Sequence, residues 1–99
     1  MSVDAIRLTH ADNVATVLRA IVAGEQVRVQ CGETVETVVA SQPIPLCHKI
    51  ALVALQPGEQ VRKYGEVIGV VTAAIAAGGH VHVHNMASRR GKQPVNRAR

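Results

Sequence analysis

A seven-residue pattern that recurs along the chain limits its fold more than any other feature. In each copy an apolar residue is followed by two spacers, a glycine, two more spacers and a valine. The copies span residues 21–27, 55–61 and, more loosely, 75–81. In the second copy Pro57 stands before Gly58, a strong turn signal through which a helix does not continue. We therefore predict that each copy is a strand, a glycine turn and a following strand.

The repeat also decides how the segment before its first copy is interpreted. Val14, Val17, Leu18 and Ile21 fall at helical spacing, so periodicity alone favours an amphipathic helix. If the copies share one conformation, this segment belongs to the strands instead. The copies are irregularly spaced and therefore do not form a solenoid. We predict a mainly β fold, a compact barrel or clip of short bent strands, with at most one or two short helices.

Further elements are predicted on either side of these turns. Residues 3–9 alternate well enough to be a first strand, and residues 27–41 are typical of a strand pair that turns near Gly32. Residues 72–77 are consistent with a short helix that Gly78 ends.

Composition limits the class of partner. The 99 residues suit one small domain, which we place at residues 1–87. Val, Ile, Leu and Ala must fill its core, since the chain has no Trp or Phe and Tyr64 is its one Tyr. The lack of aromatic rings argues against stacking of nucleic-acid bases, and no apolar run is long enough to span a bilayer. We expect neither a nucleic-acid nor a membrane partner.

The net charge of +4 comes from one end of the chain. Five of the 11 basic residues follow Met86, while residues 1–86 carry six basic and seven acidic groups, a formal charge of −1. We predict that residues 88–99 are a basic, flexible tail. The functional alternatives for this tail are docking on an acidic partner surface and weak contact with a polyanion.

The two cysteines indicate a reducing compartment. Cys31 and Cys47 are too few for a disulfide framework, and no secretory signal precedes them. Two reduced thiols are the natural interpretation, so we predict a cytoplasmic location.

A row of histidines is the strongest sign of chemistry. If residues 80–85 are a strand, His80, His82 and His84 share one face, and the two valines between them share the other, which is apolar enough to lie on a core. Each imidazole is a hydrogen-bond donor, an acceptor and a metal ligand near neutral pH. Neighbours in this row lie about 6.6 Å apart, so one metal bridges two of them but hardly all three.

A complete metal site would therefore need a ligand from elsewhere. The candidates are His10, His48, Asp12 and a partner chain. The alternative for the row is a histidine-rich edge strand with solvent on one face.

Four ordered motifs resemble the signatures of the altronate/galactarate dehydratase family. Residues 44–52, Ile-Pro-Leu-Cys-His-Lys-Ile-Ala-Leu, are similar to its Ile-Pro-x-Gly-His-Lys-x-Ala-Leu signature. Residues 63–69 resemble its Lys-Tyr-Gly-x-x-Ile-Gly element, residues 80–85 resemble Val-His-x-His-Asn, and residues 12–15 match Asp-Asn-Val-Ala. Four motifs in order, over about residues 5–87, form a far more specific signal than any one alone.

The resemblance implies an SAF domain with a β-clip fold. In this family the SAF domain is either the N-terminal part of a sugar-acid dehydratase or a separate small subunit, and the large part carries most of the active site. Family members remove water from altronate or galactarate and depend on a divalent metal such as iron, which we expect the large subunit to hold in the main. A sister branch, the sulfolactate sulfo-lyases, eliminates sulfite with the same two-part arrangement. A chain that ends soon after Asn85 fits the small-subunit form.

The predicted site residues all come from these motifs. Ammonium and phenol groups suit a carboxylate substrate, and imidazole nitrogens suit iron, zinc or manganese. We predict catalytic roles for His48 and Lys49, substrate binding by Lys63, Tyr64 and Asn85, and metal ligation by His82 and His84.

These assignments have structural alternatives. His48 can instead bond to the backbone and fix its turn, and Tyr64 can be the one large core residue, with its hydroxyl at the surface. Gly65 is typical of a turn. Cys47 stands where the family has Gly. If this position needs a positive φ, Cys costs about 1 kcal/mol or more there, or it serves as a thiol with a role of its own.

We predict that the chain is the small subunit of a hydro-lyase, a carbon–oxygen lyase with little activity alone. It would complete the active site of a separate large dehydratase subunit that acts on a hydroxylated sugar acid. One alternative is a stand-alone SAF module that binds a sugar acid or a metal, with homo-oligomers allowed in isolation. Another is the small subunit of a sulfolactate sulfo-lyase-like enzyme.

Overall fold

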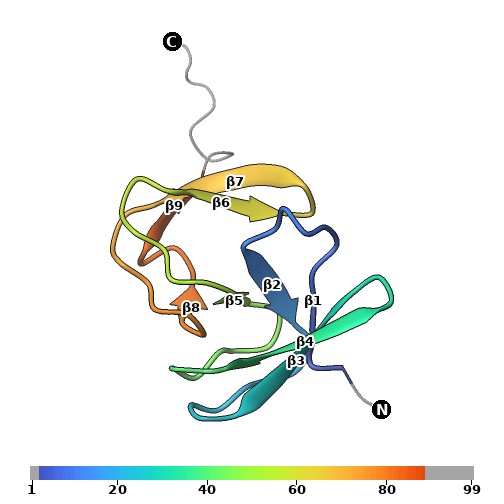
Figure 1. Cartoon of the computed structure of the whole chain (residues 1–99). Helices are drawn as coiled ribbons and strands as arrows, with labels where there is room; N and C mark the ends of the chain where they lie inside the picture. Colours follow the sequence, from blue (N-terminus) through green and yellow to red (C-terminus); the bar gives the residue numbers. More distant parts are fainter. Residues whose placement is uncertain (1–2, 89–99) are drawn as a thin grey trace.

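The computed structural model describes residues 3–88, and all regular structure in this range is β-strand (Figure 1). The strands are β1 (Ala5–Ile6), β2 (Val14–Val17), β3 (Gln26–Cys31), β4 (Thr34–Val39), β5 (Lys49–Ala51), β6 (Gln60–Lys63), β7 (Glu66–Val71), β8 (His80–Val81) and β9 (Met86–Ser88). One sheet has the order β4-β3-β1-β2-β5-β8 and the other has the order β6-β7-β9. Neighbouring strands are antiparallel except β1 and β3, which are parallel. The predicted mainly β fold of short strands, as in an SAF β-clip, is confirmed.

The three predicted copies of the repeat have the predicted conformation. Each begins at a residue in an isolated β-bridge, turns at a glycine and enters a strand. The turn glycines are left-handed, with φ of 90° at Gly24, 93° at Gly58 and 81° at Gly78. The structure adds a fourth copy, residues 44–50, in which Cys47 has a φ of 70° in the place of the glycine.

The four turns associate in two reciprocal pairs. The first residues of paired turns bridge each other, Ile21 with Ile44 and Leu55 with Ile75. In every turn the left-handed residue also donates its amide to the carbonyl just before the partner turn's loop. These bonds run from Gly24 to Ala40, from Cys47 to Val17, from Gly58 to Val71 and from Gly78 to Ala51, at 2.8 to 3.1 Å.

Each pair of turns closes over its own hydrophobic core. As the composition requires, both cores are filled by aliphatic side chains, and their buried members are at most 7% exposed. The first core contains Ile21, Ile44 and Ile50, and the second contains Leu55, Ile75 and Val81. The chain is therefore built as two similar halves.

The remaining predictions for single elements have mixed outcomes. Residues 14–17 are the strand that the repeat indicated and not a helix, and β3 and β4 turn at Gly32 as predicted. The predicted first strand over residues 3–9 is only β1. The predicted helix over residues 72–77 is wrong: it is a loop that continues into a turn, because Ile75 starts the copy of the repeat at residues 75–81. No helix in residues 3–88 has the length and hydropathy to cross a membrane.

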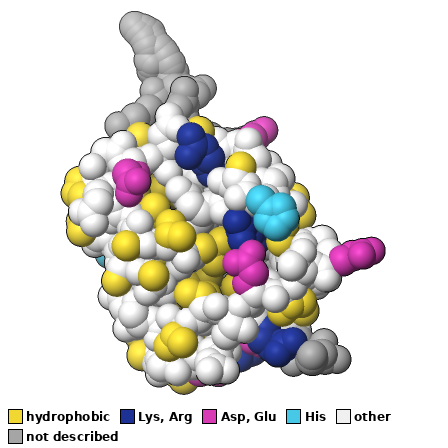
Figure 2. Space-filling model, viewed as in Figure 1, with side chains coloured by type: hydrophobic (Ala, Val, Ile, Leu, Met, Phe, Trp, Pro, Cys, Tyr) yellow, Lys and Arg dark blue, Asp and Glu magenta, His cyan; other side chains and the backbone are white. Residues whose placement is uncertain are grey.

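The surface agrees with a body that carries little net charge. Figure 2 shows basic and acidic side chains interspersed on one face of the molecule. The predicted tail over residues 88–99 lies outside the described residues except for Ser88, which is the last residue of β9. Cys31 is buried, Cys47 is exposed, and both are free thiols.

Candidate metal centre

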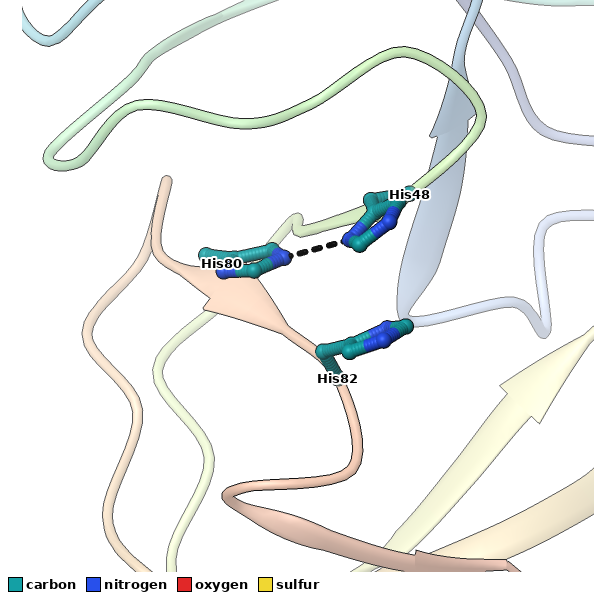
Figure 3. A group of neighbouring side chains, drawn as sticks. All are labelled: His48, His80 and His82. Carbon is teal, nitrogen blue, oxygen red and sulfur yellow. Dashed lines mark hydrogen bonds between the residues drawn. The ribbon is translucent and has the colours of Figure 1, made fainter.

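Three histidines from two segments of the chain converge at the surface (Figure 3). His48 lies just before β5, His80 begins β8 and His82 follows it. One ring nitrogen from each lies within 4.8 Å of the other two, and His48 Nδ1 is 2.8 Å from His80 Nε2. The rings of His48 and His82 stack, with centroids 4.0 Å apart. The side chains thus offer three nitrogen ligands at one point.

Two of the four repeat turns bring these rings together. His48 follows the left-handed Cys47 in the turn at residues 44–50, and His80 closes the turn at residues 75–81. Strands β5 and β8, which leave these turns, pair side by side with Ile50 opposite His80. Because the pairing fixes the register, His48 and His80 are held beside each other.

Backbone contacts fix the position of His80 and His82. The buried Asn85 donates from its side-chain amide to His80 O at 2.8 Å, and its carbonyl oxygen accepts from His82 N at 3.0 Å. Gln42 Oε1 accepts from His80 N at 2.9 Å. Both ends of the Asn85 amide thus hold the backbone of these two residues, and substrate binding by Asn85 stays a prediction.

The electrostatics favour neutral imidazoles. Burial, followed by the nearby charges of His48 and other basic groups, lowers the pKa of His80 below its ordinary 6.5. The pKa of His82 is lowered in the same way, by burial first and then by His48 and Lys49. Lys49 is half-buried, and burial together with Lys63 lowers its pKa. A neutral imidazole is the form that ligates a metal.

The donor set fits a divalent transition metal. Two imidazole nitrogens on one metal lie about 3.0 to 3.4 Å apart when each bond is about 2.1 Å. The 2.8 Å between His48 and His80 and the 4.8 Å limit for the whole group need only small ring movements to reach such spacings. Imidazole suits iron and zinc, and three protein ligands leave a coordination position open, as in catalytic sites.

The predicted row of three histidines on one strand is wrong in extent. Strand β8 ends at Val81, and residues 82–85 form a turn, so Val83 is 74% exposed instead of lying on the core. The ring of His84 is tilted against that of His80, with centroids 5.1 Å apart, and it also lines a surface groove with Asn85. His84 is therefore not one of the three converging ligands among residues 3–88.

Of the candidates for a further ligand, the structure brings only His48 to the row. The Asp12 carboxylate accepts hydrogen bonds from Thr9, Tyr64, Gly65 and Leu8, which ties the Lys-Tyr-Gly turn to the first loop. Burial acts to raise the pKa of Asp12, but the bonds from Gly65, Tyr64 and Thr9 outweigh it and hold the pKa below 3.8. His10 is exposed and lies outside the three-histidine group.

One alternative placed Tyr64 in the core, and the structure shows that this is wrong. It is 45% exposed and has a φ of 57°, next to Gly65 with a φ of 78° in the tight turn between β6 and β7. The turn predicted from Gly65 is confirmed. Lys63 Nζ lies 5.0 Å from the centroid of the Tyr64 ring. Substrate binding by Lys63 and Tyr64 stays a prediction.

Sequence reasoning included His80 in the row but did not assign it to the metal, and it missed Gln42. The signal for His80 was available, because the alternation of residues 80–84 already placed it in one row with His82 and His84. No local signal marks Gln42, whose contact with His80 spans 38 residues.

Comparison with known proteins identifies the domain. Residues 3–89 match the family model described as the altronate/galactarate dehydratase SAF domain. The chain belongs to this family. It is 41% identical over 80 residues to altronate dehydratase of Escherichia coli strain K12 and 36% identical over 80 residues to that of Bacillus subtilis strain 168. Each match covers 81% of this chain but 15% of the relative.

A second group of relatives is much shorter. The SAF chain is 47% identical over 51 residues to (2R)-sulfolactate sulfo-lyase subunit alpha of Paracoccus pantotrophus. This match covers 52% of this chain and 76% of the relative. The SAF domain is thus similar both to a small part of a long dehydratase and to most of a separate subunit.

Proposed function

We propose that this SAF domain is the small subunit of a metal-dependent sugar-acid hydro-lyase of the altronate dehydratase type. The observation that carries the proposal is the convergence of His48, His80 and His82, whose nitrogens meet within 4.8 Å at the surface. The domain corresponds to 15% of the altronate dehydratases that it matches, so the rest of such an active site would come from a large subunit.

In this proposal the three imidazoles hold a divalent metal, iron in the first place, together with ligands from the large subunit. When bound, the metal supplies Lewis-acid stabilisation of the charge that develops as the substrate loses hydroxide. His80 and His82 suit this role because their pKa values are lowered and the rings stay neutral. Asn85 keeps the backbone of both residues in place.

Lys49 is the residue that we assign to proton transfer. It is half-buried next to His48, and burial together with the repulsion of Lys63 lowers its pKa, the direction that favours a general base. In this role its neutral amine accepts the proton from the substrate carbon that carries the carboxylate. Lys63 contributes positive charge that attracts the carboxylate, from the neighbouring turn.

The decisive experiment is co-expression of the chain with a dehydratase-type large subunit. We expect a stable complex that forms the keto acid from altronate or galactarate, with each chain nearly inactive alone. Lys49→Gln should lower kcat by about 100-fold or more in an intact complex. A large subunit that reaches the full rate without this chain, or that does not bind it, would overturn the proposal.

A second candidate is a subunit of a sulfolactate sulfo-lyase-like enzyme. It is favoured by the match that covers 76% of the sulfo-lyase subunit alpha at 47% identity. The same complex assayed for sulfite release from sulfolactate separates the two reactions. Tight binding of an aldarate by the isolated chain, measured by calorimetry, would instead support a stand-alone binding module.

A further inference from the structure

Gln42 connects the two turns that carry the site histidines. It lies in the loop that leads from β4 into the turn at residues 44–50, six residues before His48. Its side chain reaches the other turn, where Oε1 accepts a hydrogen bond from His80 N at 2.9 Å. The backbone of the same loop also contacts that turn, because Ser41 N donates to Gly78 O at 2.9 Å.

No equivalent residue of the repeat makes this connection. The loops before the four turns have the same bend, and the position of Gln42 is held by Arg19, Val53 and Ala73 in the others. Arg19 bonds within its own half, to Asp4 and Glu25. Val53 and Ala73 have no polar side-chain atom. The contact from Gln42 is therefore a local addition to the shared architecture, at the one place where the two halves build the histidine cluster.

The fit between this loop and the turn at residues 75–81 is close. A Cβ at Gly78 would lie 1.9 Å from Val39 O, and one at Gly79 would lie 3.3 Å from Gln42 Oε1. Two consecutive glycines let the turn lie directly against the loop. As a result, the backbone of His80 is placed by the segment that also leads to His48.

We propose that Gln42 is a positioning residue that sets His80 against His48. The hydrogen bond fixes the backbone of His80 relative to the loop of the first half, and this fixes the separation of the two ring nitrogens. The inference rests on the proposed function only where it concerns a bound metal. The arrangement of the rings is a property of the chain alone.

The test compares three variants of the full chain. Gln42→Met removes the acceptor at similar length, and Gln42→Glu keeps an acceptor at the same reach. Gln56→Met is the matched control, an exposed glutamine on the turn at residues 55–61. NMR of the metal-free protein reads the amide exchange of His80 and the ring-nitrogen shifts of His48 and His80. Calorimetry with Zn²⁺ reads the metal affinity, and thermal unfolding reads stability.

For Gln42→Met we expect faster His80 amide exchange by about fivefold to tenfold, loss of the His48–His80 ring contact and about tenfold weaker Zn²⁺ binding. Gln42→Glu should restore all three, and Gln56→Met should change none. Equal melting temperatures would show that the loss is not general unfolding. Unchanged ring shifts in Gln42→Met, or the same losses in Gln56→Met, would overturn the inference. The ring contact can change as expected while neither the wild type nor any variant binds Zn²⁺. In that case the positioning role of Gln42 stands and the proposed metal function fails.

Discussion

The four turns of the repeat share one backbone but serve two purposes. We call residues 21–27 and 55–61 the glutamate turns, and residues 44–50 and 75–81 the histidine turns. In the glutamate turns the residue after the left-handed glycine is Glu25 or Glu59. Each carboxylate accepts a hydrogen bond from a backbone amide of its own turn, Val22 N at 2.7 Å and Gln56 N at 2.6 Å. The equivalent residues of the histidine turns are His48 and Gly79, which make no such bond.

The two kinds of turn differ in which side chains are available for a functional site. In a glutamate turn the carboxylate accepts a hydrogen bond from an amide of its own turn, so this side chain is engaged within the turn. The histidine turns lack this internal acceptor, and the one at residues 75–81 is held from outside by Gln42 and Asn85, which bond to the backbone of His80. The side chains of the histidine turns are therefore free to meet each other across the boundary of the two halves. One turn of each pair is structural, and the other carries the site.

The largest effect on stability is expected when glycine is replaced by alanine in each of the two kinds of turn. Gly58→Ala, in a glutamate turn, meets no atom within 4 Å and should cost only the left-handed penalty of about 1–2 kcal/mol. Gly78→Ala, in a histidine turn, puts a Cβ 1.9 Å from Val39 O and should cost more than about 3 kcal/mol. Denaturant unfolding measures both. Equal losses at the two glycines would remove the claim that the histidine turn depends on its neighbours.

A smaller effect is expected at Cys47, the one turn position of the four that is not glycine. Its φ of 70° strains a residue with a Cβ. Cys47→Gly should raise the free energy of unfolding by about 0.5–1 kcal/mol, since relief of strain exceeds the added freedom of the unfolded chain. Chemical denaturation checks this value. Lower stability of the variant would mean that the thiol makes a contact worth more than the strain.

The smallest perturbation is a pH titration followed by amide NMR, which needs no substitution. The side-chain bond from Arg19 and the bond from the Val22 amide lower the pKa of Glu25 below 4.5. The hydrogen bond from Val22 N to the ionised Glu25 is therefore complete above pH 4.5, and it weakens as the pH falls further and the carboxylate is protonated. The Val22 amide should therefore shift only below pH 4.5. Signals of His80 and His82 should shift below pH 6.5, because burial lowers the pKa of both. If Val22 follows the histidine titration, the two kinds of turn are not independent.

Much of the fold could be predicted because its turns leave a mark in the sequence. Glycine at a left-handed position with apolar residues three before and three after identified three copies, and it correctly overruled the helical spacing of Val14 and Val17. The fourth copy was missed because Cys47 stands in the glycine's place and Pro45 changes the spacers. The false helix at residues 72–77 overlapped the copy at residues 75–81, which the repeat already predicted to be a strand, a glycine turn and a strand.

The site could be predicted in part. The alternation of residues 80–84 pointed to the right segment, and His48 was among the expected partners of the row. The strand ends at Val81, however, because the Asn85 side chain folds residues 82–85 into a turn. This bond removes His84 from the converging group. Contacts between side chains and backbone, or between residues far apart in the chain, leave no periodic pattern in the sequence. They could therefore be found only in the structure.

The central claim is that His48, His80 and His82 form one metal site across the two histidine turns. Calorimetric titration of the full chain with Zn²⁺ tests it directly. We expect one site in the wild type, at least about 100-fold weaker binding in His48→Ala, His80→Ala and His82→Ala, and a change below about threefold in His84→Ala. No binding by the wild type, or an equal loss in His84→Ala, would contradict the account.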